Sequence, residues 1–291
     1  YYYGEVITLT ATPDEGWSFD GWYEEGVKIS EETPFEIEIM EERNIYALFT
    51  INEYTLTVNS ENGVVEKDPD SGTYEYNTVV ELHAISDEGY HFIDWTGDIE
   101  GEENPDTILI DSDKEVTANF EINKYTFSLD ATGNGEISKV PDLAEYEHGM
   151  ELTITATPDE GWSFDGWYEN GTRFSLDQSE KILLTESKEL WALFTINNYF
   201  LNIDVLGEGS VTKIPDKEMY EFGDVVTLTA FEIEGWKFSS WIGDVTDLEN
   251  NVTAITMSET KEATAVFERK SFDLNLSKDG NGEISKSPDK S

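Results

Sequence analysis

The stretch Gly16-Trp17-Ser18-Phe19-Asp20-Gly21-Trp22 returns in close variants three more times along the 291-residue chain. The variants occupy 89–95, 161–167 and 235–241, and the second Trp recurs after 73, 72 and 74 residues. A fixed period of this size marks tandem structural units. The function therefore has to be sought in an array of small domains.

A second recurring stretch closes each unit: Ala47-Leu48-Phe49, Ala118-Asn119-Phe120, Ala192-Leu193-Phe194 and Ala265-Val266-Phe267. A new strand-like opening follows each one, as in Tyr54-Thr55-Leu56-Thr57-Val58. These landmarks predict complete units at 53–123, 124–197 and 198–270. Residues 1–52 form a unit that lacks its first hairpin, and 271–291 supply the first hairpin of a further unit.

Apolar residues inside a unit alternate with a period of two, as in Leu152, Ile154 and Ala156. This alternation indicates half-buried strands, whereas a helix would give a period of 3.6. Gly-rich stretches such as Gly133-Asn134-Gly135 predict hairpin turns, and the Pro-Asp pairs that begin at 69, 141, 215 and 288 mark the next turn. We expect a mainly β fold made of small domains of about 70 residues, which form an elongated chain.

The aromatic residues of the motif have two interpretations. Exposed pairs could stack on sugars, but a unit without disulfides also needs a few large buried side chains. Recurrence at one position in every unit favours the core interpretation. The predicted core residues are Trp17, Trp22, Tyr90, Trp95, Trp162, Trp167, Trp236, Trp241, Phe49, Phe120, Phe194 and Phe267.

The charge of the chain excludes some partners. Its 63 acidic and 18 basic residues give a net charge of −45 at neutral pH, which repels nucleic acid and anionic lipid. No apolar run reaches the roughly 20 residues that a membrane helix needs. The chain has no cysteine, so disulfides and thiolate metal sites are excluded.

No recurring set of residues indicates catalysis. The three histidines, His83, His91 and His148, fall at positions that do not correspond between units, so we expect neither an enzyme nor a bound cofactor. Asp68, Asp70, Asp111 and Asp113 are weak candidates for Ca²⁺ ligands, although they lack the order of an EF-hand loop. Asn170 and Asn251 begin N-glycosylation sequons and are candidate glycan sites.

Two subtypes alternate along the chain. The first and third units continue their motif with Trp-Tyr-Glu, and the second and fourth with Trp-x-Gly-Asp. At these residues the chain resembles the internalin B-repeat family, also called the Listeria-Bacteroides repeat, together with its divergent form. The resemblance implies a small β-rich module, β-grasp-like in the standard form, or a small sandwich. It also implies a place on secreted or cell-wall-attached proteins, where such repeats act as spacers without catalytic residues.

The ends of the chain suggest continuation. Ser287-Pro288-Asp289-Lys290-Ser291 followed by Tyr1-Tyr2-Tyr3-Gly4-Glu5 nearly restores the sequence at 214–223. We expect either a window on a longer covalent array or a subunit whose terminal hairpin completes the next copy by strand addition. Head-to-tail contacts that do not close would build an open filament.

The expected function is therefore a non-catalytic extracellular array, a stalk, spacer or filament subunit whose partners are copies of itself or neighbouring repeats. The alternative is an adhesin or carbohydrate-binding module that contacts a cell-surface glycan or another cell. Its binding residues would lie in the variable loops after the motif, at 24–34, 99–105, 170–176 and 245–253.

Overall fold

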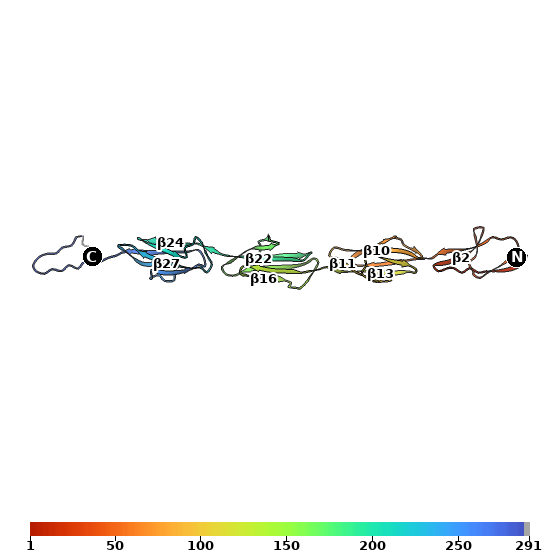
Figure 1. Ribbon diagram of the computed structural model, residues 1–291, viewed down its shortest axis with the longest axis horizontal. Coiled ribbons are helices and arrows are strands. Elements are labelled where there is room, and N and C mark those ends of the chain that lie inside the picture. The colour runs from red at the N-terminus through yellow and green to blue at the C-terminus, as the bar shows by residue number, and fades with distance from the viewer. Residues whose placement is uncertain (288–291) are drawn as a thin grey trace. The chain divides into compact units, whose positions relative to one another are not determined.

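The computed structural model describes residues 1–287 and contains strands but no helix in that range (Figure 1). We call residues 1–52 repeat 1, 53–123 repeat 2, 124–197 repeat 3 and 198–270 repeat 4. Close packing groups the chain into two units. Unit 1 comprises Tyr1–Phe127, Leu143–Glu151 and Leu183–Lys188, and unit 2 comprises Ser128–Asp142, Leu152–Ile182 and the chain from Glu189 onward.

Repeat 2, which lies in unit 1, consists of two three-stranded sheets and a short bridge. The sheets have the orders β12-β10-β8 and β11-β13-β7, and β6 pairs with β9. The strands are β6 (Glu53–Tyr54), β7 (Leu56–Ser60), β8 (Gly63–Asp68), β9 (Tyr74–Glu75), β10 (Thr78–Ser86), β11 (Tyr90–Gly97), β12 (Asp106–Ile110) and β13 (Lys114–Ile122).

Repeat 4, which lies in unit 2, has the same topology. Its sheets have the orders β25-β27-β29 and β24-β30-β28, and β23 pairs with β26. The strands are β23 (Asn198–Tyr199), β24 (Leu201–Leu206), β25 (Gly209–Ile214), β26 (Tyr220–Glu221), β27 (Val225–Glu232), β28 (Trp236–Gly243), β29 (Val252–Thr256) and β30 (Lys261–Arg269).

Repeat 3 adds one strand to this plan. Its sheets have the orders β16-β18-β21 and β15-β22-β19-β20, and β14 pairs with β17. The strands are β14 (Lys124–Tyr125), β15 (Phe127–Thr132), β16 (Gly135–Val140), β17 (Tyr146–Glu147), β18 (Met150–Pro158), β19 (Trp162–Glu169), β20 (Thr172–Ser175), β21 (Ser179–Leu184) and β22 (Lys188–Ile196).

The hairpin predicted at the start of each complete repeat is wrong: its two strands, β7 and β8, β15 and β16, or β24 and β25, lie in different sheets, because the first strand lies beside the last strand of the repeat. Repeat 1 lacks these two strands, and its sheets have the orders β1-β4 and β3-β2-β5. The strands are β1 (Glu5–Leu9), β2 (Trp17–Glu24), β3 (Val27–Ser30), β4 (Phe35–Ile39) and β5 (Ile45–Ile51). Residues 271–287, predicted to open a further unit, contain no strand. The opening strands of a complete repeat pair with later strands of the same repeat, and residues 1–287 contain no such partners for 271–287. The predicted Pro288-Asp289 turn lies outside the described residues.

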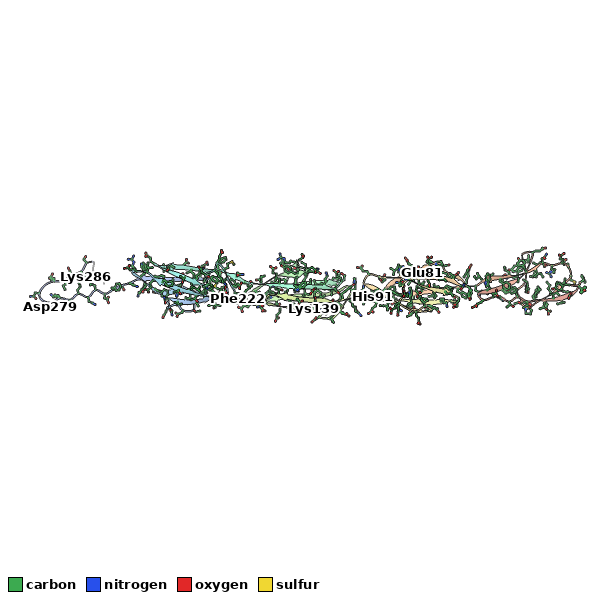
Figure 2. All side chains as sticks on the ribbon, viewed as in Figure 1. Glu81, His91, Lys139, Phe222, Asp279 and Lys286 are labelled. Carbon is green, nitrogen blue, oxygen red and sulfur yellow. The ribbon has the colours of Figure 1, made fainter. Side chains whose placement is uncertain are left out.

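The prediction of a mainly β fold is confirmed, and the two facing sheets correspond to the small sandwich rather than to a β-grasp. In repeat 2 one buried cluster joins Leu82 and Ile108 of one sheet to Trp95 and Val116 of the other. Repeat 4 has the same arrangement around Trp241. The core therefore lies between the sheets, and side chains also project outward from both (Figure 2).

A β-bulge in the motif strand explains its unusual spacing. The pairing of β11 with β13 shifts between Phe92 and Asp94, and the other three motif strands shift at the matching point. Side chains of a regular strand alternate, so residues three apart face opposite sides. The extra residue of the bulge instead lets Phe92 and Trp95 pack together in the core, with ring centroids 5.2 Å apart.

A buried tyrosine in each complete repeat holds the Pro-Asp turn. Tyr220 is fully buried, and its hydroxyl donates to the carbonyl of Pro215 at 3.0 Å and accepts from Lys217 N at 3.2 Å. Tyr74 makes the corresponding bonds to Pro69 and Ser71. The burial of this tyrosine leaves its hydroxyl dependent on the turn for hydrogen bonds.

Removing that hydroxyl tests its contribution. Tyr220→Phe keeps the buried ring and removes both bonds, so we expect a loss of about 1–2 kcal/mol in the free energy of unfolding of repeat 4. Tyr1→Phe is the matched control, because Tyr1 has the same position in repeat 1 but is 89% exposed. Denaturant unfolding followed by Trp fluorescence measures both; equal effects would contradict this role.

Candidate functional site: the repeat junctions

The second Trp of the motif ties the variable loop to the core. Trp22, Trp95, Trp167 and Trp241 are at most 8% exposed. Their indole N–H groups donate to loop carbonyls at 2.8–3.1 Å, namely those of Glu32, Glu103, Asp177 and Asn250. A buried indole N–H needs such a partner. The loop is thus anchored in every repeat, and in repeats 2, 3 and 4 this Trp ring is enclosed rather than available to a ligand.

The first aromatic of the motif is less buried. Trp17 is 43% exposed, so the prediction that it is a core residue is wrong, while Tyr90, Trp162 and Trp236 are half-buried. In repeat 4 the turn between β24 and β25 reaches this ring, since a Cβ on Gly207 would lie 2.9 Å from Trp236. Residues 1–52 contain no such pair of strands, which explains the exposure of Trp17. Phe49 and Phe120 are half-buried, whereas Phe194 and Phe267 are buried.

An asparagine in the variable loop fastens it to a core strand in the two divergent repeats. Asn104 Nδ2 donates to Ala84 O at 2.7 Å, and Asn251 Nδ2 donates to Ala230 O at 3.2 Å. Thr253, the third residue of the second sequon, is buried and accepts from Asp247 N. A glycan on Asn251 would therefore cost a loop anchor. Asn170 lies exposed in a turn with a φ of 50°.

The two subtypes differ in how the motif strand ends. In repeats 2 and 4 the glycine of Trp-x-Gly-Asp lets a neighbouring carbonyl approach, since a Cβ on Gly97 would lie 2.4 Å from Glu115 O. Asp98 Oδ2 then accepts from Glu115 N at 2.7 Å. In repeats 1 and 3 the last residues of the motif strand pair instead with an additional edge strand, β3 or β20. The two sequence subtypes thus correspond to two structures: an aspartate holds the end of the motif strand in repeats 2 and 4, and an additional edge strand pairs with it in repeats 1 and 3.

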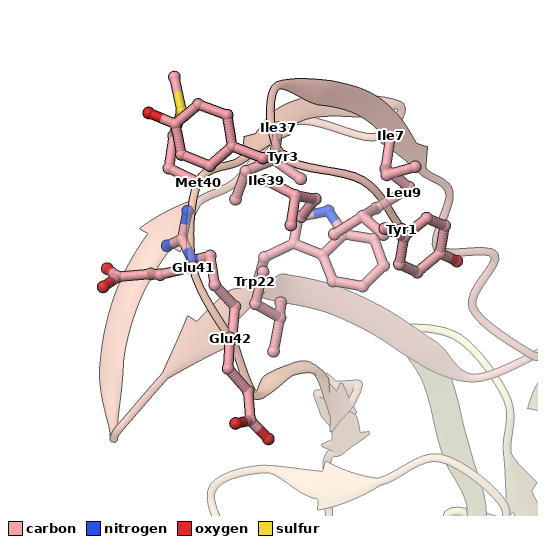
Figure 3. Close-up of a pocket in the computed structure, with 12 residues that line it drawn as sticks. Tyr1, Tyr3, Ile7, Leu9, Trp22, Ile37, Ile39, Met40, Glu41 and Glu42 are labelled. Atoms are coloured by element: carbon pink, nitrogen blue, oxygen red, sulfur yellow. The ribbon is translucent and has the colours of Figure 1, made fainter.

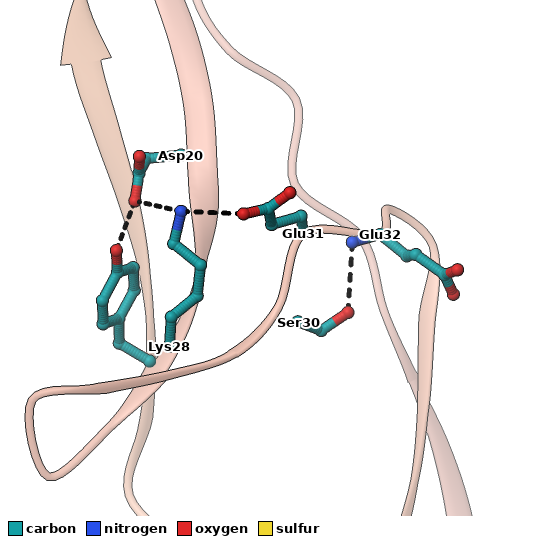
Figure 4. Close-up of polar contacts among 6 residues, drawn as sticks. Asp20, Lys28, Ser30, Glu31 and Glu32 are labelled. Atoms are coloured by element: carbon teal, nitrogen blue, oxygen red, sulfur yellow. Dashed lines mark hydrogen bonds and ion pairs between the residues drawn. The ribbon is translucent and has the colours of Figure 1, made fainter.

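A charged cluster on the outer face of repeat 1 braces this additional strand (Figure 4). The Tyr23 hydroxyl donates to Asp20, and Lys28 Nζ lies 3.1 Å from both Asp20 Oδ2 and Glu31 Oε1. The Tyr23 bond and then Lys28 hold the pKa of Asp20 below its ordinary value. Repeat 3 repeats the arrangement with Tyr168, Asp165 and Arg173. These charges support the hairpin and are paired with one another.

The candidate calcium ligands do not gather. Asp70 pairs with Lys67 at 2.9 Å and Asp111 with Lys114 at 2.6 Å. Asp113 accepts two bonds from Thr55, and the backbone one is the larger cause of its lowered pKa. Among residues 1–287 no group of three or more acidic or histidine side chains is placed to hold a metal ion. Asp68 is exposed.

An apolar groove opens on repeat 1 (Figure 3). It has a volume of about 610 Å³, and Ile7, Leu9, Trp22, Ile37 and Ile45 contribute to its lining. In repeat 2 the corresponding residues are buried in a core that includes Leu56 of the first long strand, β7. The groove therefore marks the face that this strand covers in the complete repeats.

A single asparagine joins each repeat to the next. Asn52 N donates to Gly16 O of the preceding motif at 2.8 Å, and Asn52 O accepts from Tyr76 N of the following repeat at 2.8 Å. Asn123 makes the same bonds to Gly89 and His148, and Asn197 makes them to Gly161 and Phe222. Both backbone groups of each linking residue are thus satisfied, which fixes the linker on both sides.

The side chains complete these junctions. The Oδ1 atom of each asparagine bonds the residue two after the motif glycine, with Ser163 Oγ at 2.6 Å from Asn197 and His91 Nδ1 at 2.7 Å from Asn123. A ring of the next repeat covers the glycine itself. A Cβ on Gly161 would lie 2.1 Å from Phe222, and one on Gly16 would lie 2.0 Å from Tyr76. Only glycine fits beneath this ring.

Two histidines meet at the junction of repeats 2 and 3. His91 bonds the linking Asn123, while the His148 ring covers Gly89 and its Nδ1 lies 3.3 Å from the Tyr125 hydroxyl. They replace the serine and the aromatic ring of the other junctions. His83 lies exposed on β10, opposite Glu66. Histidine thus substitutes for other linking residues at this junction.

These features define a class of protein: an array of small two-sheet repeats coupled through one-residue junctions. The sequence matches the model of the Divergent InlB B-repeat domain family at residues 1–53, 54–124, 125–198 and 199–271, so the chain belongs to that family. The resemblance inferred from the motifs is thereby confirmed. All four repeats match this one model, including the two whose motif has the standard form.

Two bacterial relatives from Evansella cellulosilytica are similar over most of the chain. One, provisionally named a membrane protein, is 31% identical and is matched over 82% of this chain and 36% of its own length. The other, provisionally named a Gly-rich membrane protein, is 29% identical over 83% of this chain and 27% of its own length. The chain thus spans about a third of these relatives.

A solved structure, the Bacillus anthracis TIE protein, is similar at 9% identity with a TM-score of 0.36, covering 81% of this chain and 55% of its own. A score this low supports no argument about function. Among the described residues, no helix has the length and apolar character required to cross a bilayer.

A glycine substitution tests the junction. Gly161→Ala introduces a Cβ against Phe222, whereas Gly235→Ala introduces one with no described neighbour within 4 Å. Their φ angles of 79° and 83° impose the same backbone strain of about 1 kcal/mol. We expect Gly161→Ala alone to accelerate amide exchange at Asn197 and Phe222. Equal protection of these two amides in both variants, measured by NMR, would contradict the coupling.

The excess of acid predicts a salt response. With a net charge of −45, screening by about 0.5 M NaCl should raise the melting temperature by several degrees. The surface ion pairs that salt weakens contribute about 0–1 kcal/mol each and are outnumbered by repulsive contacts. CaCl₂ at equal ionic strength should raise the melting temperature by the same amount, as measured by calorimetry. A larger rise with Ca²⁺ that Asp111→Asn and Asp113→Asn abolish would reveal a specific site.

Proposed function

We propose that this chain is a non-catalytic structural array on the outside of the cell, where it acts as a stalk or spacer. The observation that carries the proposal is the junction: three linking asparagines repeat the same two backbone bonds. The three histidines, by contrast, hold positions that do not correspond between repeats. What the array repeats is therefore a means of joining domains.

Composition and relatives support the extracellular location. The strong negative charge keeps a densely displayed chain soluble, and the absence of cysteine removes any need for a controlled redox environment. The two relatives are provisionally named membrane proteins. We propose that parts of a longer protein outside this array hold it at the surface and supply any binding activity.

Shortening the array tests the spacer function. Deleting residues 53–197 in the source cells joins Asn52 directly to Asn198 and so preserves the one-residue junction. We expect antibodies to label intact cells both with the full-length protein and with the deletion variant. In immuno-electron micrographs, the distal part of the deletion variant should lie closer to the cell surface than that of the full-length protein. A protein found only inside cells would contradict the location, and an unchanged distance would contradict the spacer role.

Adhesion is the alternative, and exposed apolar side chains in a variable loop favour it. Phe174 and Leu176 are 43% and 64% exposed in the loop of repeat 3. Glycan-array binding that Phe174→Ser and Leu176→Ser abolish, while Leu143→Ser on another exposed position leaves it intact, would support this function over the spacer. No binding is expected if the array is a spacer.

A filament is the second structural possibility, and the groove on repeat 1 favours it. The first long strand covers the matching face in the complete repeats, and residues 271–287 resemble the first two long strands of a complete repeat in sequence. A second copy could therefore complete repeat 1 by strand addition. We expect deletion of 271–291 to abolish any concentration-dependent assembly seen by analytical ultracentrifugation. Assembly that survives this deletion would exclude strand exchange.

A further inference from the structure

The first and last long strands lie side by side in each complete repeat, and they run parallel in repeats 2 and 4. In repeat 2, β7 pairs with β13 from Leu56 opposite Lys114 to Ser60 opposite Ala118. In repeat 4, β24 pairs with β30 from Leu201 opposite Lys261 to Leu206 opposite Val266. In repeat 3, β15 and β22 are likewise neighbours in the sheet. These parallel pairs stand out because most other pairings in the repeats are antiparallel.

This arrangement determines what tension does to a repeat. The chain reaches β7 from Asn52 and leaves β13 at Asn123, so the two linkers attach to opposite ends of a parallel pair. A pull on the linkers draws the strands in opposite directions along their common axis. The hydrogen bonds between them are then loaded together, in shear, and must fail nearly at once. A hairpin pulled at its open end instead loses its bonds one after another.

From this geometry we infer that the pairing of first and last strands is a shear clamp, and that the repeats bear tensile force. The inference rests on the proposed structural role and specifies it: the array resists stretching as well as providing length. The force enters and leaves each repeat through the strands that the parallel ladder holds together.

Contacts at the start of the ladder reinforce it. Asp113 Oδ1 accepts from Thr55 N at 2.8 Å and from Thr55 Oγ1 at 2.9 Å, and Lys114 N donates to Thr55 O at 2.9 Å. Asn59 Nδ2 donates to Glu115 Oε1 at 2.9 Å on the same pair of strands. These bonds cross between the two strands that tension would separate, so they add to the resistance of the ladder.

The core opposes sliding of the strands. Leu56 on β7 is 8% exposed, and Val116 and Ala118 on β13 are almost completely buried beside it. A slip of one residue would turn these side chains to the other face of the sheet, and a longer slip would leave part of the core empty. Shear therefore requires the core to open together with the ladder.

The junctions transmit the load with little slack. One residue separates β13 from β14, and its N–H and C=O are both bonded, to Gly89 and His148. A flexible linker would absorb extension through its own entropy before the domains were loaded. The described linkers at Asn52, Asn123 and Asn197 are one residue long and hydrogen-bonded on both sides, so they cannot absorb extension in this way.

Repeat 1 provides an internal contrast. Its last strand, β5, pairs with β2 alone in a sheet of order β3-β2-β5, and no parallel strand lies beside it within the described chain. Its sheets retain the buried Trp22 but lack the clamp. Repeat 1 should therefore yield to tension before the three complete repeats.

Single-molecule force spectroscopy of the full chain, held at its two ends, tests the clamp. We expect three high-force events, each releasing roughly 70 residues or about 250 Å of extended chain, preceded by a low-force event from repeat 1. Uniformly low forces, or a repeat 1 as resistant as the others, would overturn the inference. Surface labelling of cells is independent of this result, so failure of the clamp and failure of the extracellular role are distinguishable.

A matched pair of variants isolates the reinforcing contact. Asp113→Ala removes both bonds to Thr55, whereas Asp111→Ala removes a carboxylate from the same turn that pairs only with Lys114 and Ser112. We expect Asp113→Ala to raise the unfolding rate of one repeat about tenfold at a given force, with the other repeats unchanged. No change, or an equal change in Asp111→Ala, would argue against the clamp.

The direction of pulling provides the decisive control. Val79 and Leu109 are exposed and face each other on the antiparallel strands β10 and β12, and the chain has no cysteine. Force applied through handles on Val79→Cys and Leu109→Cys would therefore break the hydrogen bonds between β10 and β12 one after another, starting from one end of the pair. The unfolding force should fall well below that measured through the chain ends. Equal forces in both directions would show that resistance comes from core stability alone and would overturn the inference.

Discussion

The burial of one Trp per repeat is the constraint on which the rest of the structure depends. A sandwich of about 70 residues buries little surface, and without disulfides it needs large side chains that reach both sheets. Trp95 and its equivalents are enclosed, and their indole N–H groups hold the loop that follows the motif. One side chain thereby supplies apolar burial and also fixes the loop that follows the motif. The remainder of each repeat is arranged around it.

The bulge beside this Trp connects the core to the sequence motif. Without the extra residue, Trp17 and Trp22, five apart, would face opposite sides of the strand; with it, Trp17, Phe19 and Trp22 can share one side. The motif glycine at its start then serves the neighbouring repeat, because its bare Cα accepts the ring of Tyr76, His148 or Phe222. The same seven residues therefore build the core of one domain and the junction with the next.

Much of the fold could be predicted from the sequence, because alternation, turns and period are local signals. The alternation of Leu152, Ile154 and Ala156 gave a strand, and their burial on one face is what the pattern implies. Pairing partners are not local. Nothing in the sequence shows that β7 pairs in parallel with β13 instead of forming a hairpin with β8. The role of Phe92 was missed because a bulge breaks the period of two. The buried Tyr74, Tyr146 and Tyr220 could have been found from their recurrence before Glu.

The candidate site was harder to predict for a related reason. The linking asparagines recur in the sequence, but Asn52 acts through its backbone N–H and C=O, which every residue possesses. His91 and His148 do not align between repeats, yet they meet because they lie on opposite sides of Asn123. Searching for equivalent positions within repeats therefore overlooks contacts made between them.

The parallel pairing also explains why a single residue is enough to link two repeats. If the first and last strands were antiparallel neighbours, the chain would enter and leave the domain at the same end of the sheet. A longer linker would then be needed to reach the next domain. Parallel neighbours place the two linkers at opposite ends of the sheet, so a single residue is sufficient to begin the next domain. The short junction and the parallel ladder are thus two consequences of one topology, and a longer linker would be needed if either strand were reversed.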